Sequence, residues 1–251
     1  MSAFIGILSL DTRFPRIPGD AGNVASYHLP AQIRVVPGAG SPDIVRDGRP
    51  APDLVARFIA AAQALEAEGA VLITSTCGFL ISVQEEIARA VRCPVLLSGL
   101  ALVPVVRAMT GGRPVGILTA SRPSLGPAAL AAAGCTPDQV HIAGLEGDPV
   151  FAATFLAAKS AQSETLDPVQ IAASVCAAGR ALITDHPGIG AIVLECGNLP
   201  PYAAALHAAT GRPVFSILDG ARMAAPRGQS LLQVTAGQGL AGAMPPASPL
   251  T

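Results

Sequence analysis

Two cysteines occupy matching places in this chain, and their placement suggests acid–base chemistry at carbon. Cys77 and Cys196 each end an apolar run, and each is followed at the same offset by a Pro-Val pair, at 94–95 and 213–214. Such matching indicates an internal duplication. If the two halves face each other across a cleft, one thiol can take a proton from a carbon atom while the other supplies one from the opposite side.

The position of each cysteine at the end of an expected strand places it where ligands bind. In parallel α/β sheets the carboxyl ends of the strands open onto the ligand crevice. A helical pattern follows each cysteine, so backbone N–H groups are expected near each sulfur, where they would favour the thiolate. The same N–H groups can hold a carboxylate or an enediolate. The neighbouring residues expected to bind substrate are Thr74, Ser75, Thr76, Gly78, Phe79, Gly197 and Asn198.

A free cysteine often behaves as a small buried hydrophobic residue, and this is the competing interpretation for each position taken alone. It is the better account for Cys93, Cys135 and Cys176, which lack a comparable counterpart in the other half. The duplication favours chemistry for Cys77 and Cys196.

The polar loop at residues 11–23 follows the first expected strand and is predicted to border the same cleft. Asp11 is a candidate for orienting Cys77 or a substrate amine, and Arg13 or Arg16 for clamping a carboxylate. The alternative is that these loop residues lie in solvent or cap turns. Strand alternation predicts that Glu195 points away from the adjacent cysteine and has a structural role.

The motifs of metal, nucleotide and serine chemistry are missing. The four histidines stand singly and without HExxH spacing, so no metal is expected. Residues 237–242 fit GxGxxG literally but leave no room for the helix and acidic residue that a dinucleotide site requires. GxSxG and P-loop signatures do not occur. These observations favour cofactor-independent proton chemistry.

The elements that must position the cysteines alternate between strands and helices. Strands are predicted near residues 3–9, 33–36, 70–75, 94–98, 114–119, 138–143, 190–195 and 213–217. Helical patterns lie at 53–68, 78–92 and 168–186, the last with Asp167 as N-cap and Pro168 at its first position. Strand–helix–strand repeats predict parallel sheets. The fold class is therefore α/β, with helices flanking each sheet.

The halves also match at their beginnings, because Gly6-Ile-Leu recurs as Gly116-Ile-Leu. We therefore predict two pseudo-symmetric α/β lobes with the active site between them. Residues 1–108 form the first lobe, which about 216–235 complete, and 109–215 form the second. Residues 236–251 have little bulky apolar content and are predicted to be a flexible tail.

Composition excludes several classes of protein. The 251 residues are 51% hydrophobic and 13% charged, which permits a large core in one large domain or two small ones. A net charge of −1 without a basic cluster argues against nucleic acid as a partner. The sequence shows neither a basic signal-peptide start nor an apolar run of roughly 18 residues, so no membrane association is expected and a cytoplasmic location is predicted. Five cysteines without CxxC spacing are expected to be reduced.

The segments Thr74-Ser-Thr-Cys77-Gly-Phe and Leu194-Glu-Cys196-Gly-Asn-Leu-Pro-Pro-Tyr202, with the two Gly-Ile-Leu strands, resemble the aspartate/glutamate racemase superfamily. The resemblance spans nearly the whole chain except the tail. It implies a cofactor-independent enzyme with two pseudo-symmetric lobes and one catalytic cysteine from each, Cys77 and Cys196. A homodimer is also implied.

Within that superfamily, Arg34-Val-Val-Pro-Gly, Cys77-Gly-Phe and Glu195-Cys196 before Leu199-Pro-Pro-Tyr202 look like the algal dimethylsulfoniopropionate lyases and many bacterial relatives. Amino-acid racemases of the superfamily commonly carry Asn and a hydroxyl residue after the first cysteine, and Thr then often His after the second. Here Gly-Phe and Gly-Asn stand in those places. This difference argues against standard glutamate or aspartate specificity.

The predicted function is an isomerase: a racemase or epimerase that acts on an amino acid or related small carboxylate through Cys77 and Cys196. The first alternative is a lyase of the dimethylsulfoniopropionate type, which begins with the same proton abstraction. The second is a two-lobed small-ligand binding protein without catalysis, which gives no reason for paired strand-end cysteines.

Overall fold

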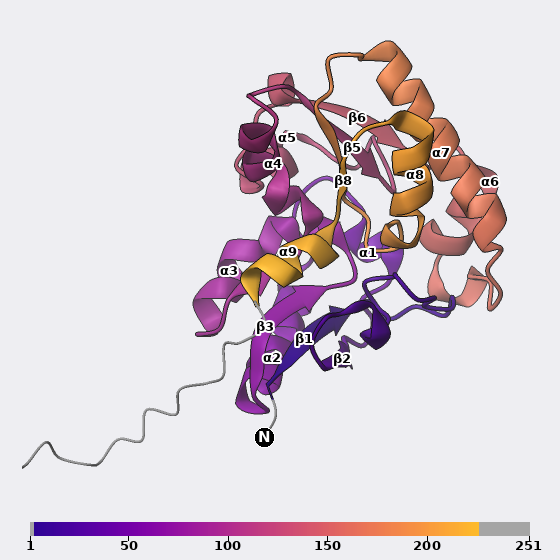
Figure 1. Cartoon of the computed structure of the whole chain (residues 1–251). Coiled ribbons are helices and arrows are strands. Elements are labelled where there is room, and N and C mark those ends of the chain that lie inside the picture. The colour runs from indigo at the N-terminus through magenta and orange to yellow at the C-terminus, as the bar shows by residue number, and fades with distance from the viewer. Residues whose placement is uncertain (1–2, 226–251) are drawn as a thin grey trace, which may run out of the picture.

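The structure is a computed structural model that describes residues 3–225, and it contains two four-stranded parallel sheets. Their strands are β1 (Phe4–Ser9), β2 (Ala31–Val35), β3 (Ala70–Ser75), β4 (Val95–Leu96), β5 (Val115–Thr119), β6 (Val140–Gly144), β7 (Ala191–Leu194) and β8 (Val214–Phe215). The order is β2-β1-β3-β4 in the first sheet and β6-β5-β7-β8 in the second, so the two sheets share one topology. All eight strands predicted from the sequence are confirmed, although β4 and β8 are shorter than expected. The α/β class with two lobes is likewise confirmed (Figure 1).

Helices cover both faces of the first sheet. The helices packed on its strands are α2 (Pro52–Ala67), α3 (Gln84–Ala90) and α9 (Ile217–Ala224). The same part of the chain contains α1 (Ser41–Ile44) and the short 3₁₀ helices η1 (Val24–Ser26), η2 (Gly78–Val83) and η3 (Gly99–Leu102). Helix α2 packs closely on one face, because a Cβ atom at Gly6 would lie 3.0 Å from Leu65 Cδ1. On the opposite face, Ile5 and Ile7 cluster with Ala221 of α9. The chain therefore returns to the first sheet after completing the second (Figure 1).

The second sheet repeats this packing. Its helices are α4 (Val103–Met109), α5 (Pro127–Ala132), α6 (Pro149–Phe151), α7 (Pro168–Asp185) and α8 (Ala203–Thr210), with η4 (Pro137–Gln139), the π-helical η5 (Ala152–Leu156), η6 (Lys159–Ala161) and η7 (Pro200–Tyr202). A Cβ atom at Gly116 would lie 3.1 Å from Leu182 Cδ2 of α7, which matches the contact of Gly6 with α2. The recurring Gly-Ile-Leu thus marks the same close approach of strand and helix in both lobes.

Two local predictions can be checked directly. Asp167 caps α7 by accepting hydrogen bonds from the backbone N–H groups of Val169 at 3.0 Å and Gln170 at 3.1 Å, as predicted. The single helix predicted at 78–92 is wrong, because η2 and α3 divide it at Gln84. The Gln84 amide bonds to the backbone of Val95 and Leu97, and these contacts fix where α3 begins.

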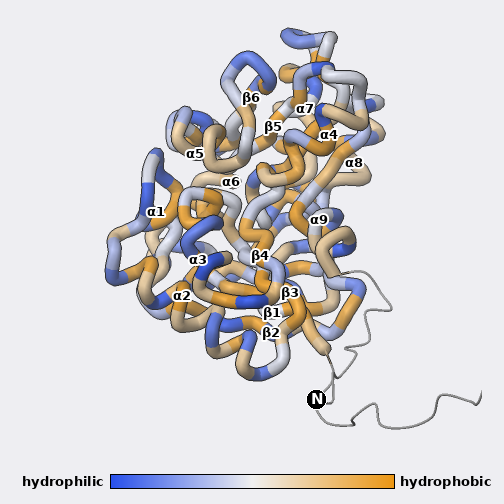
Figure 2. Tube along the Cα trace, turned by 90° about the vertical axis from the view of Figure 1, so that its left-hand side faces the viewer, coloured by the Kyte–Doolittle hydropathy of each residue, from blue (hydrophilic) through white to orange (hydrophobic). Residues whose placement is uncertain are grey.

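The core of each lobe lies between its sheet and its helices. The strands β1, β3 and β4 are hydrophobic along most of their length, whereas many of the polar segments lie toward the periphery (Figure 2). Within residues 3–225, no helix is both long and apolar enough to cross a lipid bilayer. The lobe boundary near residue 109 stays a prediction, and the tail predicted at 236–251 lies outside the described residues.

Candidate active site

Cys77 and Cys196 lie at one cavity between the lobes. Each is the second residue beyond its strand, after β3 and β7 respectively, and each is 7% exposed. Both line the same cavity, whose volume is about 20 Å³ and which also receives side chains from the first loop and from η5. That volume is roughly the room that one water molecule needs. The cavity is therefore closed around the two thiols.

The two cysteine loops press directly on each other. A Cβ atom at Gly78 would lie 2.1 Å from the Glu195 carbonyl oxygen, and one at Gly197 would lie 2.4 Å from the Thr76 carbonyl oxygen. Each residue that follows one cysteine thus meets the residue that precedes the other. Only glycine fits at either position, and this close approach brings the two strand ends to one site. Gly78 and Gly197, predicted as substrate contacts, are the residues that permit the approach.

Backbone groups face both sulfur atoms in the same way. The N–H of Phe79 lowers the pKa of Cys77, and the N–H of Asn198 lowers that of Cys196. Burial opposes these effects and is larger, so the pKa of Cys77 rises to about 12 and that of Cys196 rises well above its usual value. The expected preference for thiolate is therefore wrong for this closed cavity. Desolvation and the nearby Glu195 carboxyl outweigh the N–H groups.

Of the charged residues predicted in the first loop, Arg16 lines the cavity. Its guanidinium pairs with Asp20 at 3.1 Å, donates to Thr12 Oγ1 at 3.1 Å, and lies 4.4 Å from the centre of the Phe14 ring. Asp20 in turn accepts a hydrogen bond of 2.8 Å from Asn198 Nδ2. The Oδ1 atom of Asn198 accepts one of 3.4 Å from the Cys196 thiol. Arg16 is therefore linked through two side chains to the second cysteine.

Asp11 and Arg13, the other two charged residues predicted in this loop, do not line the cavity. Asp11 forms an ion pair with Lys159 and accepts a hydrogen bond from Gly38 N at 3.3 Å. Arg13 forms an ion pair with Glu164. The loop turns after β1 so that these two side chains reach the segment 157–166 at the outer rim. They tie the first loop to the second lobe.

The three hydroxyl residues before Cys77 have different roles. Ser75 Oγ donates to Leu97 O at 2.6 Å and accepts from Cys77 N at 3.2 Å, so it holds the cysteine loop in place. Thr76 lines the cavity and accepts a hydrogen bond of 3.1 Å from Leu10 N. Thr74 is buried and is not part of the cavity wall. Phe79, on the other side of the cysteine, also lines the cavity.

Glu195 is the main residue whose position the sequence mispredicted. It lines the cavity beside both cysteines and is 1% exposed. Strand β7 ends at Leu194, so strand alternation no longer applies at Glu195. Its Oε2 atom accepts a hydrogen bond of 2.8 Å from Thr119 Oγ1, and burial raises its pKa to about 7. The signal in the sequence that could have placed Glu195 at the cavity is an acidic residue directly before a strand-end cysteine.

An aromatic wall was also missed. Phe14 and Phe155 pack edge to face at a centroid separation of 4.8 Å and line the cavity together with Leu10 and Leu156. Phe155 and Leu156 belong to η5, whose short irregular turns have no clear periodicity in the sequence. The wall makes most of the cavity lining apolar.

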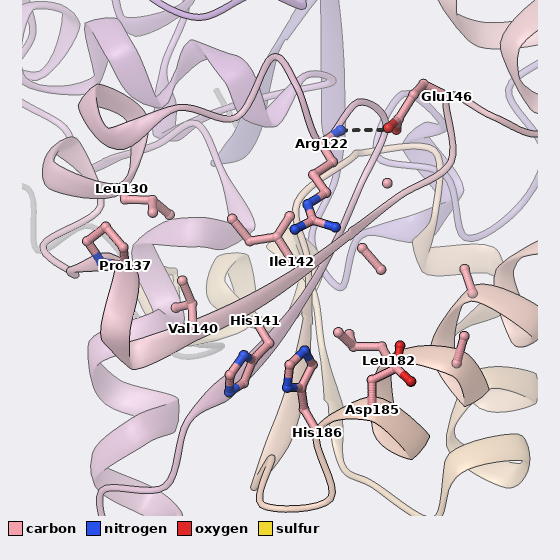
Figure 3. A pocket seen from close by; sticks show the side chains of 14 residues that line it. Arg122, Leu130, Pro137, Val140, His141, Ile142, Glu146, Leu182, Asp185 and His186 are labelled. Atoms are coloured by element: carbon pink, nitrogen blue, oxygen red, sulfur yellow. Dashed lines mark hydrogen bonds between the residues drawn. The ribbon is translucent and has the colours of Figure 1, made fainter.

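A larger cavity of about 550 Å³ lies at the outer edge of the second sheet (Figure 3). Strand β6 and helix α7 form much of its wall, and His141 stacks on His186 with ring centroids 3.7 Å apart. The Arg122 backbone N–H donates to Glu146 at 3.0 Å across its rim. Its lining comes entirely from the second lobe and includes none of the predicted site residues.

Comparison with known proteins identifies the family of this chain. A model of the Asp/Glu/Hydantoin racemase family matches residues 24–227, and the chain belongs to that family. The family prediction from the cysteine motifs is thereby confirmed.

Two lyases are among its sequence relatives. Dimethylsulfoniopropionate lyase of Durusdinium sp. clade D is 33% identical over 227 residues, which are 87% of this chain and 73% of that protein. Dimethylsulfoniopropionate lyase 3 of Emiliania huxleyi is 32% identical, with 84% of this chain and 56% of that protein covered. The aligned parts span 43% to 64% of the length of four Emiliania huxleyi relatives.

Solved structures confirm the fold. Unliganded arylmalonate decarboxylase superposes with a TM-score of 0.54 at 17% identity and covers 90% of this chain and 94% of its own. Allantoin racemase from Klebsiella pneumoniae gives a TM-score of 0.54 at 18% identity, with 88% of this chain and 84% of its own covered. At these identities the similarity establishes the two-lobed architecture.

Proposed function

We propose that this protein is a lyase of the dimethylsulfoniopropionate type, which removes a proton from the carbon next to a carboxylate and then expels a sulfide. The observation that carries the proposal is the pair of thiols, one from each lobe, at a single closed cavity. The sequence relatives named as dimethylsulfoniopropionate lyases support elimination as the outcome.

Arg16 is the proposed carboxylate clamp. Its guanidinium is held in place by Asp20 and Thr12 and stands over the Phe14 ring, so little rotamer freedom remains to be lost on binding. The backbone N–H groups of Phe79 and Asn198 face the two sulfurs. A substrate bound beside the sulfurs would place its enediolate oxygens, on which negative charge develops, near these N–H groups. Together these groups would stabilise the carbanion that proton removal creates.

The aromatic wall supports a sulfonium substrate over an amino acid. Phe14, Phe79 and Phe155 line the cavity, and aromatic faces attract cations that cannot donate hydrogen bonds. An α-ammonium group requires acceptors instead. Of the two carboxyl groups that the described residues place near the cavity, Asp20 is already bound by Arg16 and Asn198, and Glu195 has one oxygen bound by Thr119 and one without a partner. A dimethylsulfonio group fits this wall better than an ammonium group does.

In the proposed reaction Cys77 is the base. The Cys196 thiol is directed toward Asn198 Oδ1, whereas no such partner holds the Cys77 proton in the described structure. As the thiol proton of Cys77 passes to a general base, the sulfur takes the proton from the carbon next to the carboxylate, and the electron pair of that C–H bond forms the C=C bond of acrylate. The C–S bond breaks, and its electron pair leaves with neutral dimethyl sulfide.

A second candidate is a racemase or epimerase, which was the first choice from the sequence. The opposed arrangement of the two cysteine loops supports it, because return of a proton to the opposite face needs a second thiol. In that case Cys196 would supply the proton. The two reactions share their first step and differ only in what happens to the carbanion.

The test is incubation with dimethylsulfoniopropionate and a panel of amino acids in D₂O, followed by NMR and headspace chromatography. Acrylate and a volatile sulfide indicate the lyase, and Cα deuteration without elimination indicates the racemase. We expect Cys77→Ser to lose at least about 10²-fold in elimination, with Cys196→Ser less affected. Racemisation would require both thiols. Cys176→Ser on α7 is the matched control, and activity that survives loss of both Cys77 and Cys196 would contradict the mechanism.

A further inference from the structure

Glu195 has one bound and one free carboxyl oxygen. Oε2 accepts hydrogen bonds from Thr119 Oγ1 at 2.8 Å and from Ala120 N at 3.4 Å. Oε1 is fully enclosed and has no hydrogen-bond partner within the described residues. A Cβ atom at Gly78 would lie 2.4 Å from this Oε1 atom, so the free oxygen lies against the residue that follows Cys77.

An enclosed carboxyl oxygen without a partner is unfavourable for folding, because water has been removed and nothing replaces it. A carboxyl with only a structural role would use both oxygens. Here the second lobe anchors one oxygen through Thr119 at the end of β5, and the other is presented to the cysteine loop of the first lobe. The arrangement leaves one position on the carboxyl available for a proton.

The charged and titratable groups that face this carboxyl are few. Cys77 lies at the start of η2, Cys196 is next to Glu195 in its own loop, and Arg16 reaches the cavity from the first loop, with Asp20 behind it. Within the described residues, the Arg16 guanidinium bonds to Asp20 and Thr12 and forms no ion pair with Glu195. The thiols are the groups with which Glu195 can exchange a proton.

We propose that Glu195 is the proton acceptor of the cysteine site and takes the Cys77 thiol proton as the sulfur takes the substrate proton. The inference rests on the proposed function for its substrate chemistry. The substrate C–H bond breaks and a new S–H bond forms, while the old S–H bond breaks and an O–H bond forms on Oε1. The net change is transfer of one proton from carbon to Glu195, without a free thiolate in the enclosed cavity.

The acid strengths of the groups agree with this division of roles. Burial raises the pKa of Cys77 to about 12, so the thiol stays protonated near neutral pH. Burial raises the pKa of Glu195 to about 7, where a carboxyl can both accept and release a proton. A group whose pKa lies near the working pH is the most effective general base.

The first test is the pH profile of turnover in Glu195→Gln and Thr119→Val. The amide of Glu195→Gln keeps an acceptor for Thr119 but cannot take a proton, so we expect about 10²- to 10⁴-fold lower kcat and loss of the acidic limb of kcat/KM. Thr119→Val removes a hydrogen bond that lowers the pKa of Glu195, so that limb moves to higher pH. Glu146→Gln, at the outer cavity of the same lobe, is the control. A Glu195→Gln enzyme with near-normal kcat and an unchanged limb overturns the proposal while the lyase assignment stands.

The second test needs no substrate. Iodoacetamide labelling of Cys77 is followed by peptide mass spectrometry from about pH 8 to about pH 12, the range into which burial raises the pKa of this thiol. The negative charge of Glu195 raises the pKa of Cys77, so Glu195→Gln is expected to move the labelling midpoint to lower pH. If the wild type turns over none of the acids, the lyase assignment fails. The labelling midpoint of Cys77 then tests the role of Glu195 by itself. A shifted midpoint shows that the Glu195 charge acts on the Cys77 thiol, as proton exchange between the two groups requires, and an unshifted one overturns the proposal.

Discussion

Gly78 and Gly197 determine how closely the two cysteines approach. Each sits where a Cβ atom would overlap a carbonyl oxygen of the opposite loop, at 2.1 Å and 2.4 Å respectively. Neither overlap involves the end of a flexible side chain, so neither can be relieved without moving backbone. The spacing of the thiols therefore depends on the absence of two methyl groups.

We predict that Gly78→Ala separates the cysteine loops and lowers stability. Overpacking of a well-packed site typically costs about 1 to 3 kcal/mol, and here it also displaces Glu195. Urea unfolding measures the loss, and turnover is expected to fall with it. Gly188→Ala is the matched control, because no atom lies within 4 Å of a Cβ at that position. Equal stability of the two variants would contradict the packing argument.

At the residue scale, the sequence predicted the positions of the cysteines but not their electrostatics. Cys77 and Cys196 could be found because duplication leaves a repeated pattern. The preference for thiolate was wrong because the balance between burial and N–H groups depends on how tightly the cavity closes. Glu195 was misplaced because β7 ends one residue earlier than strand alternation assumed.

The segment 149–166 is the element that closes the cavity. It carries Phe155 and Leu156 into the cavity wall, and its rim is tied to the first loop by the ion pairs Lys159–Asp11 and Glu164–Arg13. Exposed ion pairs contribute little to stability, typically about 0 to 1 kcal/mol. Gln162, which is 5% exposed, also joins this segment to the first loop by a hydrogen bond.

We predict that Gln162→Ala loosens this segment more than loss of an ion pair does. Gln162 accepts a hydrogen bond from Arg13 N at 2.9 Å and donates one to Ala157 O at 3.0 Å, so its removal leaves two partly buried backbone groups unpaired. The expected cost is about 1 to 3 kcal/mol. Hydrogen–deuterium exchange of the peptide at 157–164 reports the opening. Glu164→Gln is the control, and equal exchange in the two variants would refute the prediction.

A second element-scale prediction concerns the start of α7. Asp167 caps two backbone N–H groups, so Asp167→Ala is expected to cost about 0.5 to 2 kcal/mol in the free energy of unfolding. Asp185→Ala at the other end of the same helix removes an acid without removing a cap. Thermal unfolding of the two variants distinguishes the loss of the cap hydrogen bonds from the loss of a negative charge.

Elements with strong local signals were predictable, and those set by distant contacts were not. The apolar runs of the strands and the Asp-Pro start of α7 carry their structure in the local sequence. The division between η2 and α3 depends on contacts of Gln84 with β4, and the turns of η5 depend on packing against the first loop. Local patterns contain neither of these contacts.

At the scale of the whole molecule, the closed cavity implies that ligand binding involves movement of the walls. A cavity of about 20 Å³ cannot admit a small carboxylate without opening. The identical strand orders of the two sheets could be anticipated from the duplication. The extent to which the lobes close depends on many contacts between them, so it could not be predicted from the sequence. A homodimer and a cytoplasmic location stay predictions.

We predict that acidification destabilises the second lobe through its stacked histidines. Burial and the neighbouring His186 lower the pKa of His141, so the folded state binds fewer protons than the unfolded chain. The stabilisation is complete above the unfolded value near 6.5 and is lost as the pH falls through the lower folded value. Urea unfolding between about pH 7.5 and pH 5 measures this loss. We expect a smaller loss for His141→Gln, with His207→Gln on α8 as control; equal losses would contradict the assignment.

The interlocked loops have a consequence for how such sequences can diverge. The loops at 76–78 and 195–197 are packed backbone against backbone. A side chain at either glycine would therefore overlap the facing backbone, which would have to move. Homologues that carry a larger residue at one position are expected to show coordinated change at the other. Random libraries that vary one loop alone will return mostly inactive clones, whereas paired randomisation opens routes to new substrates.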